Sequence, residues 1–332
     1  MSAWFSGDQK AMDDVARSMD HTMRTTGILA IVGHGIPTDL RHAMLDVTQA
    51  FFDLPLEEKL ALRVPDVSVN RGYSPVGVEA LSYSLGIESP PDLFEAFNVG
   101  PEEVPQGVST QELADFFQPN LWPEAPAGFR TTWLTYWRAC EELGRVLLDV
   151  FARALGLPDR WFRPFVTRGP SVMRANNYPV QSPTAPRQDG QLRMGAHSDY
   201  GSLTILLADP VPGLQIRSQE GEWADVVPLE DSLVVNIGDL LAEWTNDRWH
   251  STVHRVVPPH GDQPGQGRRR SVAWFQQPNA DAIIDVLPSC TSAGNPPRYP
   301  PTSAGEHLLG KLRGSRGLEK APVAEQFLDS DR

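Results

Sequence analysis

The sequence predicts a mainly β protein with flanking helices, in which the strands form a β-sandwich or barrel. From about residue 171 onward, short apolar segments are separated by turn residues at nearly even spacing, a texture typical of sandwiches and barrels and not of βαβ units. Before residue 171 the texture is different, with helical spacing of apolar residues in several segments. No period of about 20 to 50 residues recurs, so a repeat architecture is excluded.

The N-terminal part is predicted to run helix, strand, helix. Residues 12–23 have helical spacing, residues 27–32 form an apolar run with strand character, and a helix capped by Thr38 or Asp39 runs to about Phe52. Residues 63–110 are rich in Gly, Pro and Ser but carry several aromatics, which favours an irregular yet ordered segment. A long amphipathic helix is expected over residues 128–155, before Gly156.

The second half contains the predicted strands, at residues 202–208, 213–217, 223–227, 232–237, 252–257 and 271–276. A short helix is expected near residues 306–313, followed by a polar tail. We therefore divide the chain into an N-terminal region of helices, a strand and an irregular segment (1–110), a helical support (111–170), a β core (171–290), and a C-terminal helix with its tail (291–332).

Composition excludes several classes of protein. The net charge of −13 disfavours a nucleic-acid partner, because an acidic surface repels phosphates. The acidic, polar start does not resemble a secretory signal, and no apolar run is long enough to span a bilayer. Two distant cysteines, Cys140 and Cys290, exclude a disulfide scaffold or a thiolate zinc cluster and fit a reducing cytoplasm. We expect a cytoplasmic monomer acting on a small molecule.

Two imidazoles and one carboxylate are the most informative residues. His197 and Asp199 are two positions apart, so on a strand both point to one face and can reach one ion. His254, in a later strand pattern, can supply a third ligand, and His197, Asp199 and His254 together suit Fe(II) or Mn(II). His250 rivals His254, because it lies on the same predicted strand face about 13 Å away. Spacing alone does not choose between them.

Arg269 and Ser271 are candidates for binding a carboxylate. A guanidinium and a hydroxyl in this position can hold a carboxylate-bearing molecule against the metal. The arginine triplet at 268–270 leads into an apolar strand, so at least one of its side chains is expected to point inward. Strand alternation turns Arg270 away from Arg269, and we expect Arg268 and Arg270 to face solvent.

Together these residues resemble the isopenicillin N synthase-like branch of the Fe(II)/2-oxoglutarate oxygenases. The resemblance covers most of the chain, through the stretches 27–36, 51–59, 120–123, 195–199, 213–215, 236–239 and 244–256. In the last stretch the family's distal iron histidine falls on His254, which favours His254 over His250. The resemblance implies a jelly-roll core over residues 171–290, that is, a cupin-like double-stranded β-helix. It also implies that the N-terminal region and the C-terminal segment cover the substrate.

The resemblance also implies the reaction and its cosubstrate. Its RxS motif falls on Arg269 and Ser271, which are expected to bind the distal carboxylate of 2-oxoglutarate, with contacts from Tyr178 and Asn176. Fe(II), 2-oxoglutarate and O2 would then oxidise an unactivated C–H, hydroxylation being the default and desaturation or cyclisation possible, with release of succinate and CO2. No general base is needed, so none is assigned.

One departure concerns the start of the chain. Family members usually open with a strand resembling Ile-Pro-Val-Ile-Asp, whereas this chain begins with a stretch similar to the segment just after that strand. We expect either a late start or a dispensable strand, with an exposed sheet edge as one consequence.

Other functions and the substrate stay open at this stage. The alternatives are a same-fold iron oxidase that does not use 2-oxoglutarate, an ethylene-forming type, and a non-enzymatic jelly-roll binding protein. An acidic chain of this kind suits small-molecule metabolism such as natural-product biosynthesis. Candidate substrate contacts, each also explicable as structural, are Asn70, Arg71, Tyr73, Tyr83 and Phe275.

Overall fold

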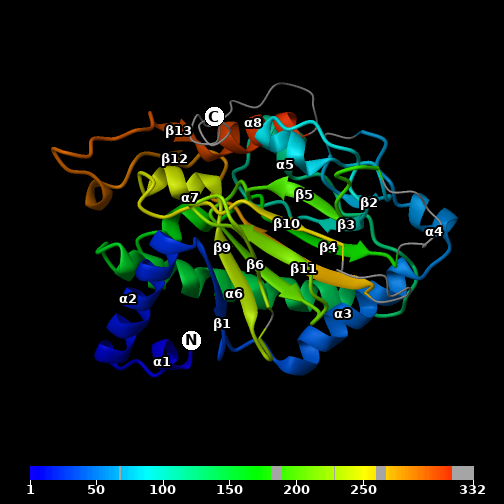
Figure 1. Ribbon diagram of the computed structural model, residues 1–332, viewed down its shortest axis with the longest axis horizontal. Helices are drawn as coiled ribbons and strands as arrows, with labels where there is room; N and C mark the ends of the chain where they lie inside the picture. Colours follow the sequence, from blue (N-terminus) through cyan, green and yellow to red (C-terminus); the bar gives the residue numbers. More distant parts are fainter. Residues whose placement is uncertain (67–68, 181–187, 228, 259–266, 316–332) are drawn as a thin grey trace.

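Two antiparallel sheets stacked on each other form the centre of the protein, with helices on the outer face of the larger one (Figure 1). This computed structural model describes residues 1–66, 69–180, 188–227, 229–258 and 267–315. The polar tail expected from the sequence lies, from residue 316 onward, outside the described residues.

The larger sheet has seven strands in the order β1-β9-β6-β11-β4-β3-β2. Its neighbours pair antiparallel throughout. In sheet order the strands are Ile28–Ile31 (β1), Leu233–Ile237 (β9), Leu203–Ala208 (β6), Arg269–Gln276 (β11), Val172–Tyr178 (β4), Glu95–Val99 (β3) and Gly72–Ser74 (β2). Strand β1 forms one edge of this sheet.

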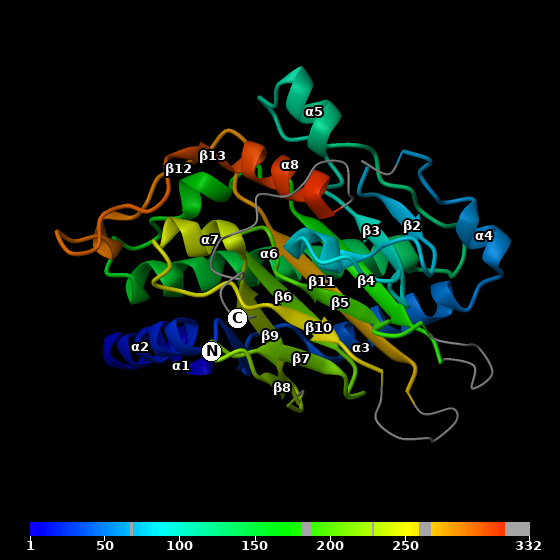
Figure 2. The ribbon, with the colours of Figure 1, turned by 45° about the horizontal axis from the view of Figure 1, so that its top comes forward.

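The smaller sheet has four strands in the order β5-β10-β7-β8 (Figure 2). They are Met194–His197 (β5), His254–Val256 (β10), Leu214–Arg217 (β7) and Trp223–Asp225 (β8). A small apolar cluster joins this sheet to the larger one, with Met194, Leu214 and Val256 on one side and Phe94 and Tyr178 on the other. The two sheets therefore enclose the interior between them, as expected for a jelly roll.

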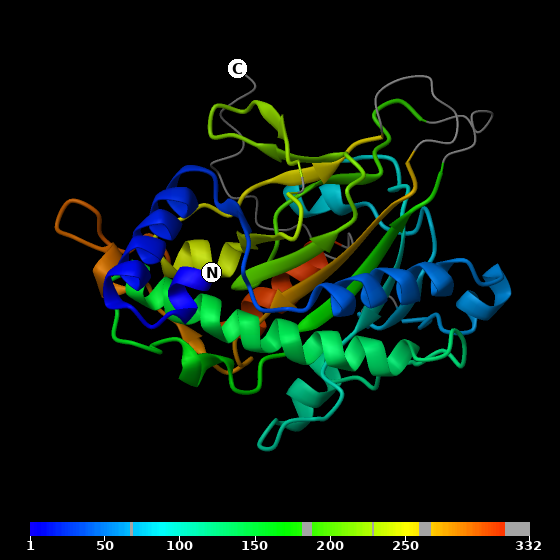
Figure 3. The same ribbon diagram turned by 90° about the horizontal axis from the view of Figure 1, so that it is seen from below.

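Helices cover the opposite face of the larger sheet, where α3 (Thr38–Phe52) and α6 (Phe129–Ala154) lie across the strands (Figure 3). Helix α2 (Gln9–Thr25) packs against α6 and β1. The other helices are α1 (Ser2–Phe5), α4 (Leu56–Leu60), α5 (Thr110–Phe116), α7 (Asp239–Trp244) and α8 (Ala304–Ser315). Short 3₁₀ turns (η1 Leu81–Leu85, η2 Arg163–Val166, η3 Pro288–Cys290) and a two-stranded ribbon (β12 Ile283–Ile284, β13 Thr302–Ser303) complete the described elements.

Strand alternation gives the larger sheet two different faces. On β11, Val272 and Trp274 are buried in the main hydrophobic core beneath the helices. The odd-numbered residues of the same strand, from Arg269 to Phe275, line the cavity between the sheets. Arg174, Asn176 and Tyr178 of β4 line the cavity in the same way. Alternation therefore gives the sheet a mainly apolar face that packs against the helices and a more polar face that lines the cavity.

The structure confirms the mainly β prediction, and the helices expected near residues 12–23, 38–52, 128–155 and 306–313 are present. The expectation of an irregular segment over residues 63–110 is wrong in part. This segment supplies β2 and β3, and every residue of β3 is buried. Because β3 is buried along its whole length, its sequence lacks the apolar–polar alternation that identifies a half-buried strand. The strand could therefore not be distinguished from the irregular segment around it.

A buried ion pair lies on the helix side of β3. Lys59 Nζ contacts Glu95 Oε2 at 2.9 Å, and both side chains are less than a tenth exposed. The Tyr73 hydroxyl donates to the same oxygen at 2.6 Å, and Asn177 Nδ2 donates to Glu95 Oε1 at 2.7 Å. Burial, followed by the neighbouring carboxylate, raises the pKa of Tyr73 far above its usual range, so it stays a donor. Glu95 thereby joins α4, β2 and β4 to β3.

We predict that Glu95→Leu lowers the free energy of unfolding by about 3 to 5 kcal/mol, because the Lys59 ammonium stays buried without its partner. Urea denaturation followed by circular dichroism measures this. The double variant Glu95→Leu/Lys59→Met should recover part of the loss, since it leaves no unpaired charge. Equal losses in the single and double variants would show that the charge of Lys59 is not what makes Glu95 important.

Candidate active site

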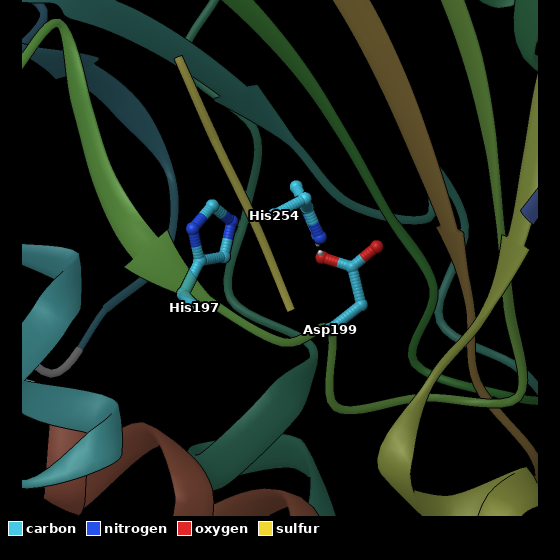
Figure 4. Close-up of side chains that lie close together, drawn as sticks. All are labelled: His197, Asp199 and His254. Atoms are coloured by element: carbon cyan, nitrogen blue, oxygen red, sulfur yellow. Dashed lines mark ion pairs between the residues drawn. The ribbon is translucent and has the colours of Figure 1, made fainter. Parts of the chain in front are cut away.

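Three side chains capable of binding one metal ion meet between the sheets (Figure 4). His197 ends β5 and His254 begins β10, and the two residues are direct cross-strand partners. Asp199 follows in the turn after β5. One ligand atom from each lies within 4.8 Å of the others, and His254 Nε2 is 3.9 Å from Asp199 Oδ1. The fold therefore brings all three predicted ligands together.

Main-chain carbonyls fix which nitrogen of each imidazole faces the site. His197 Nδ1 lies 2.8 Å from the carbonyl oxygen of Gly195, and His254 Nδ1 lies 3.0 Å from that of Thr252. Because a carbonyl only accepts, each Nδ1 must carry the hydrogen. Each Nε2 is then left with its lone pair, which is the form that binds a metal.

Asp199 is held in the same way, through the oxygen that does not face the histidines. Its Oδ2 accepts from Thr204 Oγ1 at 2.5 Å and from Asn236 Nδ2 at 2.7 Å. These donors come from β6 and β9 of the larger sheet. Oδ1 is thereby turned toward His254, so the carboxylate can offer one oxygen to an ion.

The local electrostatics keep His197 and Asp199 in their metal-binding protonation states. Burial first, and then the neighbouring His254, lowers the pKa of His197 to about 4. Burial also opposes the charged form of Asp199, but the two imidazoles and the donors Thr204 and Asn236 outweigh it and hold the pKa of that carboxyl below its usual range. At neutral pH the site therefore presents a neutral imidazole at His197 and an anionic carboxylate.

The four residues predicted to bind the cosubstrate also meet, on β11 and β4. Arg269 pairs in register with Tyr178, and Ser271 with Asn176. The Arg269 guanidinium lies 5.2 Å from the centre of the Tyr178 ring, and its buried Nε has no hydrogen-bond partner among the described residues. Burial raises the pKa of Tyr178, so its hydroxyl stays protonated. A buried guanidinium nitrogen in this state, beside two hydroxyls, fits a carboxylate ligand.

The predicted metal ligands and the residues predicted to bind the cosubstrate line one cavity of about 410 Å³. Its walls come from both sheets, from the segment around η1, and from α8, through Leu308 and Leu312. A cavity of this size holds a small molecule in addition to a dicarboxylate.

Several predictions about individual residues need correction. Asp199 does not lie on a strand, since β5 ends at His197. His250 and His254 do not share a strand, because β10 begins at His254; His250 instead lines a separate surface pocket with Arg24 and Asp247.

Arg268 and Arg270 do not simply face solvent. Arg270 pairs with Asp209 and reaches Gln49 of α3, while Arg268 pairs with Asp53 and donates to Asn177. Their side chains are only 25% and 20% exposed, so both are largely buried. Alternation does turn Arg270 to the helix side, but that side is packed against α3.

All five candidate substrate contacts border the cavity, and two of them have other partners. Arg71 donates to the carbonyl oxygens of Phe116 and Gln118 at 2.7 and 3.1 Å, and burial lowers its pKa to about 10. The hydroxyl of Tyr73 is bound to Glu95. The three others, Asn70, Tyr83 and Phe275, stay candidates for contact with a substrate.

Sequence reasoning missed several residues of the cavity, namely Glu79, Asn98, Arg174, Tyr200, Thr204, Asn236, Leu308 and Leu312. The signal for Arg174 was present, because β4 alternates between apolar residues and the polar series Arg174, Asn176, Tyr178. Asn98 carries no comparable signal, since it stands in a buried strand without alternation.

The fold and the site define a class of protein: a jelly-roll enzyme with a facial set of two histidines and one carboxylate, as found in non-haem Fe(II) oxygenases. Family models agree. Residues 1–125 match the non-haem dioxygenase in morphine synthesis N-terminal family, and residues 170–278 match the 2OG-Fe(II) oxygenase superfamily.

Curated relatives and solved structures point the same way. The chain is 33% identical to the 2-oxoglutarate-Fe(II) type oxidoreductase hxnY of Emericella nidulans, over 96% of this chain and 90% of that one. It is 29% identical to validamycin A dioxygenase of Streptomyces hygroscopicus, over 94% and 84% of the two chains. A full-length Neurospora crassa protein in complex with alpha-KG superposes with a TM-score of 0.83 at 33% identity, covering 94% of each chain.

The chain belongs to the 2-oxoglutarate- and Fe(II)-dependent oxygenase family. It is a non-haem iron dioxygenase that uses Fe(II) and 2-oxoglutarate to oxidise a small-molecule substrate. The resemblance drawn from the sequence is confirmed.

We predict that Asn236→Leu weakens Fe(II) binding by about 10- to 100-fold, because the Asp199 carboxylate loses a donor that orients it. Anaerobic titration calorimetry with Fe(II) measures the affinity. Lys10→Met, which removes an exposed ion pair on α2, is the control and should bind Fe(II) like the parent protein. An unchanged affinity in Asn236→Leu would mean that Thr204 alone suffices to hold the carboxylate.

Proposed function

We propose that His197, Asp199 and His254 bind the Fe(II) ion, and that Arg269 and Ser271 bind the distal carboxylate of 2-oxoglutarate with help from Tyr178 and Asn176. The observation that carries this proposal is the arrangement of the three ligand atoms within 4.8 Å. The Nε of Arg269, which no described residue satisfies, lies in the same cavity and supports the second part.

Bound together, Fe(II) and 2-oxoglutarate supply an oxidant for a C–H bond when O2 is present, with succinate and CO2 as co-products. The residues of the chain position and protect this chemistry. The two Nε2 atoms and Asp199 Oδ1 would hold the ion through three ligands, so that further positions on it would remain for the cosubstrate and O2. Arg269 and Ser271 set the direction of the cosubstrate, and the apolar walls exclude water. Hydroxylation is the outcome we propose.

We propose that the regions of the chain divide this work. Residues 171–290 hold the metal and the cosubstrate, residues 111–170 support the sheet through α6, and residues 1–110 together with the described C-terminal residues 291–315 cover the substrate. The positions of Asn70 and Tyr83, and of Leu308 and Leu312 on α8, around the cavity support this division.

We further propose a cytoplasmic monomer that binds neither nucleic acid nor membranes. The net charge of −13 and the free, buried Cys140 and Cys290 support it. Within the described part of the chain, no helix has the length and apolarity required to cross a bilayer.

We also propose that the prime substrate belongs to small-molecule metabolism of the kind in which the relatives act. Among proteins about 30% identical to this chain are homoarginine-6-hydroxylases, a proline hydroxylase and validamycin A dioxygenase. The Neurospora crassa protein in complex with alpha-KG and thymine, at 32% identity and a TM-score of 0.83, adds a neutral heterocycle. Because the names of these relatives span different substrates, we propose that the part of the cavity outside the iron and cosubstrate residues selects the substrate.

We predict that His254→Ala abolishes Fe(II) binding and 2-oxoglutarate consumption, as should His197→Ala and Asp199→Ala, because two remaining ligands do not hold the ion. The matched control is His250→Ala, which removes an imidazole four residues away and should leave both properties unchanged. Metal titration and succinate formation are the readouts. Wild-type turnover in His254→Ala would remove the proposed site.

We predict that Arg269→Ala raises the KM for 2-oxoglutarate on the order of 100-fold, because hydrogen bonds to a charged group are lost. Fe(II) affinity should stay at the parent value, which separates cosubstrate binding from damage to the metal site. A 2-oxoglutarate dependence equal to that of the parent protein would show that Arg269 binds something else.

A further inference from the structure

The register of the larger sheet places a second polar group beside the cosubstrate residues. On the cavity face, successive rows of side chains cross strands β11, β4 and β3. Arg269 and Tyr178 form one row, and Ser271 and Asn176 form the next. The third row consists of Ala273, Arg174 and Asn98, because Arg174 is in register with both of the others.

Asn98 carries a buried acceptor without a partner in the described part of the chain. The residue is 4% exposed and lines the cavity, and its Oδ1 makes no hydrogen bond to any described residue. A buried polar atom without a hydrogen bond is destabilising, so Asn98 Oδ1 is suited to accept a hydrogen bond from a bound ligand. The neighbouring Ala273 has a small side chain and also lines the cavity.

The Arg174 guanidinium uses only some of its hydrogen-bond donors within the protein. Its Nε donates to Asn176 Oδ1 at 2.9 Å, and its Nη2 donates to Glu79 Oε1 at 2.8 Å. Among the described residues nothing accepts from Nη1. The guanidinium also lies 5.0 Å from the centre of the Phe94 ring, which fixes its plane. Arg174 therefore keeps one free donor beside the free acceptor of Asn98, since cross-strand partners on one face are neighbours.

The positive charge of Arg174 is balanced by the negative charge of Glu79. Arg174 and Glu79 form an ion pair whose side chains are 12% and 26% exposed. An anionic ligand would compete with Glu79 for the guanidinium, and a cationic ligand would approach Arg174 unfavourably. A neutral ligand with adjacent acceptor and donor satisfies both groups without disturbing the pair.

The surroundings of this row are largely apolar. Phe275 stands in the next row of β11, Tyr200 follows the ligand Asp199, and Leu308 and Leu312 project from α8. A flat or cyclic ligand can therefore be held at its polar edge by Arg174 and Asn98 while its hydrocarbon part meets apolar walls.

We propose that Arg174 and Asn98 form the specificity subsite for the prime substrate, and that this substrate is a neutral small molecule with an adjacent carbonyl and N–H, such as a lactam or a cyclic urea. The carbonyl accepts from Arg174 Nη1, and the N–H donates to Asn98 Oδ1. This inference rests on the proposed function, because it needs the remaining cavity to hold Fe(II) and 2-oxoglutarate.

Three probes with a common six-membered ring test the class of ligand. They are δ-valerolactam, which is neutral with adjacent carbonyl and N–H; piperidine, which is cationic; and cyclohexanecarboxylate, which is anionic. Binding to the full chain with Mn(II) and 2-oxoglutarate is measured by ligand-observed NMR titration, and repeated without 2-oxoglutarate. The subsite predicts that δ-valerolactam binds more tightly than either charged probe.

Two variants test the residues. Asn98→Leu should weaken δ-valerolactam binding about tenfold, because one hydrogen bond is lost. It should not lower the melting temperature, since an apolar side chain of similar shape replaces an unsatisfied acceptor. Arg174→Gln should weaken binding similarly. Arg145→Gln, which removes an exposed ion pair on α6, is the matched control and should bind the probe like the parent protein.

The outcomes separate this inference from the function on which it rests. Equal affinity for a charged probe, no binding of δ-valerolactam, or unchanged binding in both variants would overturn the subsite. Weaker 2-oxoglutarate binding in Asn98→Leu would overturn it too, by assigning Asn98 to the cosubstrate. Failure of the parent protein to bind 2-oxoglutarate, with δ-valerolactam still bound through Asn98, would instead count against the proposed function alone.

Discussion

The pairing of β5 with β10 is the constraint on which the site depends. It sets His197 directly opposite His254, and the main-chain carbonyls of Gly195 and Thr252 then fix both imidazoles with Nε2 toward the same point. A shift of one residue in either strand would turn one ring to the other face of the sheet. Asp199, just beyond β5, completes the set only because the larger sheet holds its second oxygen.

In the larger sheet, the pairing register of the strands sets the positions of the polar residues that line the cavity. Its helix-facing residues form the hydrophobic core, so the pairing of β6, β11, β4 and β3 is fixed by burial. The residues on the cavity face of the same strands have the same register. They form successive rows, with the pair Arg269 and Tyr178 first and the pair Arg174 and Asn98 two rows further. The positions of polar groups are therefore set by packing on the opposite face.

The sequence predicted those features that have a periodic or motif signal. Helices α2, α3 and α6 were visible from spaced apolar residues, and the three candidate ligands from their residue types and surroundings. Strand β3 was not visible, because a strand buried on both faces lacks alternation, and Asn98 was lost with it. The orientation of Asp199 depends on Thr204 and Asn236 from other strands, and contacts across that separation leave no local pattern.

On the proposed function, the separation of rows also separates two tasks. The residues proposed to hold the metal and the cosubstrate cannot change without loss of the reaction, whereas Arg174 and Asn98 stand in the next row and line the same cavity. Arg174 is nevertheless joined to Asn176 by a hydrogen bond, so the two rows are not independent. A ligand that fixes Arg174 also fixes the side chain next to Ser271, which is a direct physical route by which the prime substrate can steady the cosubstrate.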